Sequence, residues 1–246
     1  MNDNIVYGIR AIIEAINAGR EVDKVLLKTG ISGELLTELR TAIKDHQIPF
    51  QYVPIQKLNN ITRKTHQGAI AFLAAVEFQN IEEVLANVYE SGKTPFILVL
   101  DKVSDVRNFG AISRSAECAG VDAIVIPAKG SAAINADAVK TSAGALHRIP
   151  VCRSNMLKDT IDYLKEYGLK VVACTEKTSN IYNEFDYTVP VAIIMGSEDK
   201  GISHEYLNRA DFHARIPMVG SIGSLNVSVA AGIILYEGLK QRGFKL

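Results

Sequence analysis

The spacing of hydrophobic positions divides the chain into two regions near residue 77. Over residues 7–17 apolar side chains recur at helical spacing, and a second helical pattern follows Ser32, which we expect to cap that helix. The apolar runs VDKVLLK, FQYV and residues 67–76 predict strands. Residues 1–76 are therefore predicted to form a small α/β domain, and residues 77–95 a linker that carries one helix.

From residue 96 onward, apolar strand patterns alternate regularly with helical ones. We expect strands at 96–100, 122–127, 170–175, 191–196 and 212–217, and helices at 110–119, 136–146, 156–167, 203–210 and 225–242. Such alternation predicts a parallel sheet covered by helices on both faces. Ligands of these sheets bind at the carboxyl ends of the strands. Residues 96–246 are therefore the candidate catalytic domain.

Composition excludes several classes of protein. The 246 residues include 27 basic and 27 acidic side chains, so the molecule as a whole is not a strongly basic nucleic-acid-binding protein. A local basic patch is still compatible with this balance. The three cysteines form no CxxC, and the five histidines lack metal-ligand spacing, so we expect no metal. No signal segment or membrane-spanning run is recognisable, and a cytoplasmic protein is expected.

Three loops at predicted strand ends carry the candidate chemistry. The first, residues 101–120, leads into a helix of small residues that contains Asn108 and Arg114. The second, GSEDKGIS, places Glu198 two residues after Gly196, the end of a buried strand. Arg114 forms either a surface ion pair or part of a site, and Glu198 is either solvated or holds the arginine in place.

The third loop, GSIGSLN, feeds a long apolar helix and looks like a phosphate loop. It lacks the lysine of G-x-x-x-x-G-K-[ST], so a phosphate-binding role is unsupported. Ser224 and Asn226 either cap the helix or face a ligand. The helix itself is apolar on nearly every face, which predicts burial, including against a second subunit.

Together the three motifs resemble the SpoU/TrmH (SPOUT) family of RNA ribose 2′-O-methyltransferases. These are N-x-G-x-x-x-R at 108–114, G-S-E-x-x-G at 196–201, and I-P-M…G-S-L-N-V-S-x-A at 216–230. The first 76 residues also resemble the ribosomal-protein-like RNA-binding domain of one branch. That branch includes the bacterial enzyme that methylates a guanosine in the P loop of 23S rRNA.

The resemblance implies a deep trefoil knot in the α/β domain, bound S-adenosylmethionine, and a homodimer packed through the 108–119 and last helices. Carried over, the cofactor site comprises Gly196, Ile216, Met218 and Leu225, with Thr141 in its wall. Arg114 matches the catalytic arginine, surrounded by Asn108, Glu198, Ser224 and Asn226. A cofactor without a phosphate explains the missing lysine.

A basic stretch in the first domain is the candidate RNA contact. ITRKTHQG places Arg63, Lys64 and His66 before a buried strand, and Arg10 lies on the first helix. These side chains either form a solvated turn or contact RNA phosphates. The leading hypothesis is 2′-O-methylation of a guanosine in 23S rRNA. The alternatives are a tRNA or another rRNA nucleotide, including a resistance-type target, or a non-catalytic ribosome-assembly factor.

Overall fold

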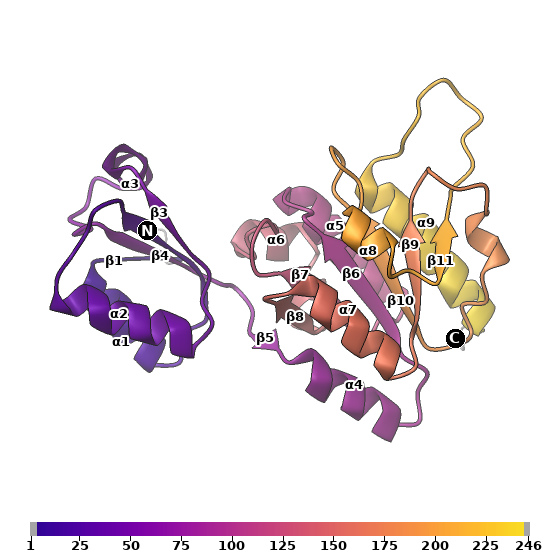
Figure 1. Ribbon diagram of the computed structural model, residues 1–246, viewed down its shortest axis with the longest axis horizontal. Coiled ribbons are helices and arrows are strands. Elements are labelled where there is room, and N and C mark those ends of the chain that lie inside the picture. Colours follow the sequence, from indigo (N-terminus) through magenta and orange to yellow (C-terminus); the bar gives the residue numbers. More distant parts are fainter. Residues whose placement is uncertain (1–3, 244–246) are drawn as a thin grey trace. The chain divides into compact units, whose positions relative to one another are not determined.

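The computed structural model describes residues 4–243, which form two compact units (Figure 1). The outermost residues of the two predicted domains, 1–3 and 244–246, lie outside this range. The first unit contains the chain up to Glu77 together with Ala133–Ala136, and the second contains Phe78–Ala132 and the chain from Asp137 onward.

The first unit is a four-stranded sheet with helices on both faces. The strands are β1 (Ile5–Tyr7), β2 (Val22–Lys28), β3 (Phe50–Val53) and β4 (Ala69–Leu73), in the order β1-β4-β2-β3. Only the β2–β3 pair is parallel. Helices α1 (Ile9–Asn17) and α2 (Glu34–Asp45) pack on one face, and α3 (Ile55–Ile61) packs on the other.

Two local features of this unit differ from the sequence-based expectation. Ser32 does not cap α2, because Gly33, with φ of 131°, occupies the N-cap position and no side chain makes a capping hydrogen bond. Helix α3 was not expected, since its seven residues bury only Leu58 fully and show little periodicity. The short strand β1 was also missed, and its three residues are all half-buried.

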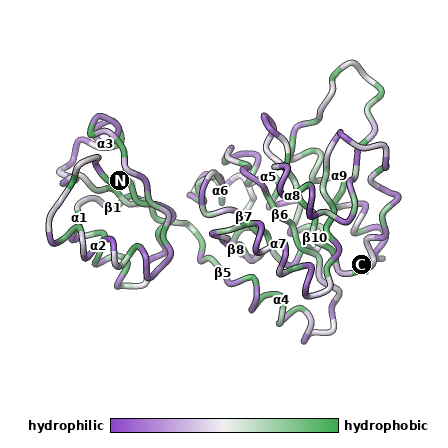
Figure 2. Tube along the Cα trace, viewed as in Figure 1, coloured by the Kyte–Doolittle hydropathy of each residue, from purple (hydrophilic) through white to green (hydrophobic). Residues whose placement is uncertain are grey.

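The second unit is built on a seven-stranded sheet in which every pairing is parallel. Its order is β11-β9-β10-β6-β7-β8-β5. The strands are β5 (Phe78–Gln79), β6 (Phe96–Asp101), β7 (Ala123–Pro127), β8 (Val151–Ser154), β9 (Lys170–Cys174), β10 (Val191–Gly196) and β11 (Phe212–Ala214). Figure 2 shows hydrophobic residues along β6 and β10, as expected for strands covered on both faces.

Helices cover both faces of this sheet. They are α4 (Ile81–Glu90), α5 (Val106–Cys118), α6 (Ala136–Thr141), α7 (Leu157–Glu166), α8 (His204–Leu207) and α9 (Val227–Arg242), with short 3₁₀ turns at Ala145–His147 and Tyr182–Glu184. Helices α4 and α7 share one apolar core with alternate residues of the central strands. Helix α9 packs against α5 and crosses Phe96 of β6 at Gly238, where an added Cβ would lie 2.8 Å from the ring.

The segment 77–95 is part of the second unit rather than a linker. Strand β5 pairs with β8 at the sheet edge, and α4 buries Val84, Leu85 and Val88 in the core. An amphipathic helix gains stability only by burying its apolar stripe, and Gly92 and Pro95 merely end it. Strand β8 was also unexpected, because VCRS is too short and mixed in composition to give a strand pattern.

The C-terminal end of α9 is fastened to the loops before β6 and β10. The Arg242 guanidinium donates hydrogen bonds to the carbonyl oxygens of Thr94 (2.7 Å), Pro95 (3.0 Å), Tyr187 (2.8 Å) and Val189 (2.8 Å). It also lies 4.5 Å from the centre of the Phe96 ring.

The trefoil knot implied by the resemblance stays a prediction. Within residues 4–243, no helix is long and apolar enough to cross a membrane.

Candidate active site

A cleft of about 820 Å³ opens at the carboxyl ends of β9, β10 and β11. It is lined by 174–177 after β9, by 195–202 after β10, and by 214–218 after β11. Residues 223–227, at the start of α9, close it. The location agrees with the rule that ligands of parallel sheets bind beyond the strands' carboxyl ends.

Gly196 shapes the floor of this cleft because its loop folds back on it. A Cβ at this position would lie 2.1 Å from the carbonyl carbon of Gly201 and 2.3 Å from the amide nitrogen of Ile202. The fold-back is fixed by a 2.8 Å hydrogen bond from the Gly201 N–H to the Ser197 carbonyl. A buried carboxylate, Asp101 at the end of β6, holds the loop's far end by accepting from the Ser203 N–H at 2.7 Å. Only glycine therefore fits at residue 196.

Asn226 joins three segments of the chain at the cleft's edge. Its Nδ2 donates to Glu198 Oε1 at 2.6 Å and to Asn108 Oδ1 at 3.0 Å. Its Oδ1 accepts from the backbone N–H of Ser228 at 2.9 Å and from the Ser228 hydroxyl at 2.5 Å. Asn226 is therefore both the N-cap of α9 and the link between the first turn of α5 and the loop after β10.

Arg114 and Glu198 do not form the ion pair that we expected. Glu198 instead accepts from Asn226, while Arg114 is exposed on α5 and makes no hydrogen bond or ion pair within the described part of the chain. Arg114 follows Asn108 by about 9 Å along the helix axis and does not line the cleft. The helix begins earlier than expected, at Val106, because Asp105 Oδ1 caps it by accepting from the N–H groups of Arg107 and Asn108.

The structure brings most of the expected cofactor residues together. Gly196, Ile216, Met218 and Leu225 all line the cleft, and so does Ser224. Thr141 does not, because it packs against Gly110 of α5, where an added Cβ would lie 2.7 Å from the Thr141 Cβ. Thr141 is therefore a helix-packing residue at the α5 surface.

Two residues near the cleft were missed by the sequence reasoning. Ser228 donates two hydrogen bonds to Asn226 Oδ1, from its backbone N–H and from its hydroxyl. The serine two residues after the asparagine in the N-V-S motif was the sequence signal that could have identified it. Arg215 lines the cleft, and its Nε is buried without a hydrogen-bond partner among residues 4–243. A buried guanidinium donor without a partner is unfavourable by about 1–3 kcal/mol, which suits a position that an anionic ligand group fills.

Within residues 4–243, the one cysteine that lines this cleft is not ionised and no metal-binding group accompanies it. Burial raises the pKa of the Cys174 thiol, so this cleft-lining sulfur is protonated and uncharged at neutral pH. Among the described residues, no group of three or more His, Cys, Asp or Glu side chains is placed to hold a metal ion.

The candidate RNA-contacting residues of the first unit have different surroundings. Arg10 and Arg63 are exposed, and Lys64 donates to the Tyr7 hydroxyl at 3.0 Å. His66 is buried, with Nδ1 accepting from the Gly68 N–H at 3.1 Å and Nε2 placed 2.9 Å from Asn59 Oδ1. Both ring nitrogens are thus occupied, so His66 fixes the turn and does not present a free donor to RNA phosphates.

Comparison with known proteins identifies the family. The SpoU rRNA Methylase family model matches residues 95–236, and the model for RNA 2′-O ribose methyltransferase substrate binding matches residues 5–79. The chain belongs to the SpoU/TrmH family. A Staphylococcus epidermidis protein named as a TrmH family tRNA/rRNA methyltransferase is 34% identical over 242 residues, which cover 98% of this chain and 97% of that one.

Solved structures share the fold. The SpoU methyltransferase AviRb of Streptomyces viridochromogenes, in complex with AdoMet, superposes with a TM-score of 0.62 at 23% identity, covering 97% of this chain and 90% of that one. The TrmH/SpoU tRNA-modifying enzyme of A. aeolicus has a TM-score of 0.55 at 31% identity, covering 65% and 83%. As a SpoU/TrmH protein, the chain is an RNA methyltransferase whose cofactor is S-adenosylmethionine (AdoMet).

The cleft suits this cofactor on its own geometry. Its volume of about 820 Å³ falls within the range typical of small-molecule sites. Gly196 leaves backbone groups accessible where any side chain would collide, and the loop needs no lysine because AdoMet carries no phosphate. The cofactor does carry a carboxylate, which matches the unpartnered Nε of Arg215.

Proposed function

We propose that this protein transfers a methyl group to a ribose 2′-OH of 23S rRNA, with guanosine as the target nucleoside. The observation that supports this most directly is the polar group of Asn226, Asn108 and Glu198 at the edge of a cofactor-sized cleft. Bound AdoMet supplies an electrophilic methyl group. The chain's own residues must then bind the ribose and stabilise the oxygen as it loses its proton.

Arg114 is the residue that we assign to this stabilisation. A guanidinium is effectively always protonated, so it serves poorly as a general base. Its fixed charge and forked donors instead favour a developing alkoxide and orient a nucleotide phosphate. Because Arg114 is exposed and has no side-chain partner within residues 4–243, its side chain is available for RNA in this proposal. The proton of the 2′-OH is then transferred to water or to a neighbouring phosphate.

Asn226, Ser224 and Glu198 position the ribose in this proposal. Because Asn226 is held by two acceptors, its amide orientation is fixed before substrate arrives. Gly196, Ile216, Met218 and Leu225 hold the cofactor, with Arg215 on its carboxylate. Thr141 is not included, since it lies against α5.

The presence of a separate substrate-binding unit in this protein favours a large RNA as its target. The first unit carries the exposed Arg10, Arg63 and Lys64, which we propose contact RNA phosphates. The A. aeolicus tRNA-modifying enzyme covers only 65% of this chain, which supports rRNA over tRNA.

We propose a cytoplasmic homodimer joined through α9, where Val229 and Tyr236 are each 51% exposed, and through α5.

The substrate assignment is tested with tritium-labelled AdoMet. Purified protein is incubated separately with 23S rRNA, 16S rRNA and tRNA from cells lacking the gene, and retained label is counted. Resistance of the labelled site to alkaline cleavage identifies a 2′-O-methyl group. Label in 23S rRNA at a guanosine is the expected result. Label confined to tRNA would replace the rRNA proposal with the tRNA alternative, and no label in any RNA would count against methyl transfer.

The role of Arg114 is tested by Arg114→Lys. Lysine keeps the charge but lacks the forked donors, so we expect turnover to fall by about 100-fold or more. AdoMet affinity, measured by calorimetry, should stay within about threefold of wild type because Arg114 does not line the cleft. Near-normal turnover would show that charge alone suffices or that Arg114 is not catalytic.

A further inference from the structure

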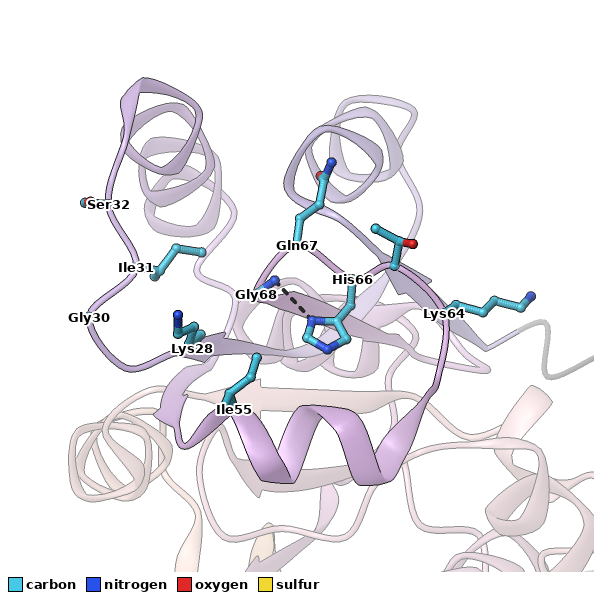
Figure 3. A pocket seen from close by; sticks show the side chains of 10 residues that line it. Lys28, Gly30, Ile31, Ser32, Ile55, Lys64, His66, Gln67 and Gly68 are labelled. Atoms are coloured by element: carbon cyan, nitrogen blue, oxygen red, sulfur yellow. Dashed lines mark hydrogen bonds between the residues drawn. The ribbon is translucent and has the colours of Figure 1, made fainter.

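A second cleft, of about 560 Å³, lies in the first unit (Figure 3). One wall is the loop that follows β2, residues 28–32, and the other is the turn 64–68 that precedes β4. Ile55, at the start of α3, closes its base. This cleft is separate from the AdoMet cleft, whose lining residues all belong to the second unit.

The walls of this cleft are joined to each other and to α3 by hydrogen bonds within the chain. His66 accepts from the Gly68 N–H through Nδ1, so its proton resides on Nε2 and points to Asn59 Oδ1 of α3. The Lys28 N–H donates to the Gly68 carbonyl at 2.8 Å, which ties the two walls together. An added Cβ at Gly68 would lie 2.8 Å from Ile31 Cδ1, so the walls approach as closely as glycine permits. A preorganised cleft loses little conformational entropy on binding.

The lining combines one available cation with apolar side chains. Lys28 is exposed, and its ammonium makes no hydrogen bond or ion pair within residues 4–243. None of the residues that line the cleft is acidic. In Figure 3 the side chains of Ile31 and Ile55 point into the same space, with the His66 ring to the right of both. Lys64 lies at the far rim, where it is directed away from Lys28 and toward Tyr7.

We infer that this cleft binds one unpaired nucleotide of the RNA substrate. The base packs against Ile31 and Ile55, and the adjoining phosphate pairs with the Lys28 ammonium. The inference deepens the proposed function and depends on RNA being the substrate. A base inside a duplex is covered by its stacked neighbours, whereas an unpaired base offers a free face for apolar contact. A site for phosphate alone would not require the apolar walls.

The inference is tested with three fluorescent stem-loop RNAs and the full-length protein. The first stem is fully paired, the second carries a single bulged purine, and the third carries the same bulge as an abasic nucleotide. Binding is measured by anisotropy at several salt concentrations. We expect the bulged RNA to bind about tenfold more tightly than the other two, since removing roughly 60 Å² of apolar base surface from water contributes on that scale.

Variants separate the contribution of the cleft from general charge. We expect Lys28→Gln to weaken binding of the bulged RNA and to reduce the salt dependence by about 0.7 in slope, the value for one phosphate contact on a single strand. Lys44→Gln is the matched control, because Lys44 is exposed on α2 and lies outside the cleft. Ile55→Ala should weaken binding of the bulged RNA only, with folding checked by a melting curve.

Two outcomes would overturn the inference. Equal affinity of wild-type protein for the base-containing and abasic bulges would exclude a base pocket, and identical behaviour of Lys28→Gln and Lys44→Gln would exclude the phosphate contact. Either result leaves the methyltransferase proposal intact, because that proposal is judged by tritium transfer to rRNA. Conversely, absence of tritium transfer with normal discrimination between the RNAs would count against the proposed reaction alone.

Discussion

Asn226→Asp separates the two structural roles of Asn226, the cap of α9 and the link between α5 and the loop after β10. Aspartate caps helices as well as asparagine, so the bond from the Ser228 N–H is retained. The change replaces Nδ2 by an oxygen. That oxygen faces Glu198 Oε1, now 2.6 Å from Nδ2, and Asn108 Oδ1, now 3.0 Å from it. Two hydrogen bonds are therefore lost and two carboxylates are brought together.

The energies can be estimated from these distances. Losing one neutral and one charge-assisted hydrogen bond removes about 3 kcal/mol, and two unit charges 2.6 Å apart repel by about 1.6 kcal/mol even in bulk water. Because Asn226 and Glu198 are exposed, the side chains move apart and solvent screens most of this. We take about 2 kcal/mol as the loss of transition-state stabilisation, which corresponds to about a 30-fold fall in kcat.

The assay is single-turnover methyl transfer to rRNA, with the melting temperature measured in parallel. We expect Asn226→Asp to be less stable than wild type by up to about 2 kcal/mol, because the two lost hydrogen bonds and the new repulsion also act in the free protein. Asn226→Ala loses those hydrogen bonds and the cap but gains no repulsion, and the lost cap alone contributes about 1 kcal/mol. AdoMet affinity should change by less than about threefold in Asn226→Asp. If Asn226→Asp retains turnover within a factor of about three, Asn226 is a helix cap only and the ribose-positioning role is refuted.

Three further predictions concern the cofactor cleft and the C-terminal helix. Gly196→Ala should abolish AdoMet binding and destabilise the protein by about 2 kcal/mol or more, since its Cβ would meet backbone, whereas Gly220→Ala, which meets nothing within 4 Å, should be neutral. Arg215→Met should weaken AdoMet about tenfold in calorimetry but leave 5′-methylthioadenosine, which lacks the carboxylate, unchanged; equal weakening of both would contradict the carboxylate contact. Arg242→Met removes four hydrogen bonds to carbonyl oxygens and should lower stability by about 2–4 kcal/mol, or roughly 5–15 °C in melting temperature, while an unchanged melting curve would contradict a fastening role.

Much of the secondary structure was predictable because hydrophobic periodicity is a local property. The patterns at β6 (Phe96–Asp101), β10 (Val191–Gly196) and α9 (Val227–Arg242) identified those elements within two residues. Strands β5 and β8 were missed, since two and four residues are too few to establish a period. Helix α4 was expected as part of a linker, because the sequence does not show what its apolar stripe packs against.

The candidate site divides in the same way. The order of the three motifs and the resemblance they carry were readable directly, and the AdoMet cofactor followed from them. The sequence did not show which side chains of the site form hydrogen bonds with one another. Glu198 and Asn226 meet because β10 lies beside β6 in the sheet and α9 packs on α5, an arrangement set by strand order. The Arg114–Glu198 pair was a reasonable expectation from charge, but Asn226 takes the carboxylate.

His66 shows why composition alone misleads. In the sequence it belongs to a basic stretch with Arg63 and Lys64, which predicts an RNA-facing surface. In the folded unit its ring is buried and both nitrogens hold the turn, because Gly68 and α3 close around it. The sequence by itself determined most of the longer elements, the family and the chemistry available. The tertiary structure decided which polar groups satisfy one another and which, like Arg114, Arg215 Nε and the Lys28 ammonium, have no partner among residues 4–243, because those partnerships join residues far apart in the chain.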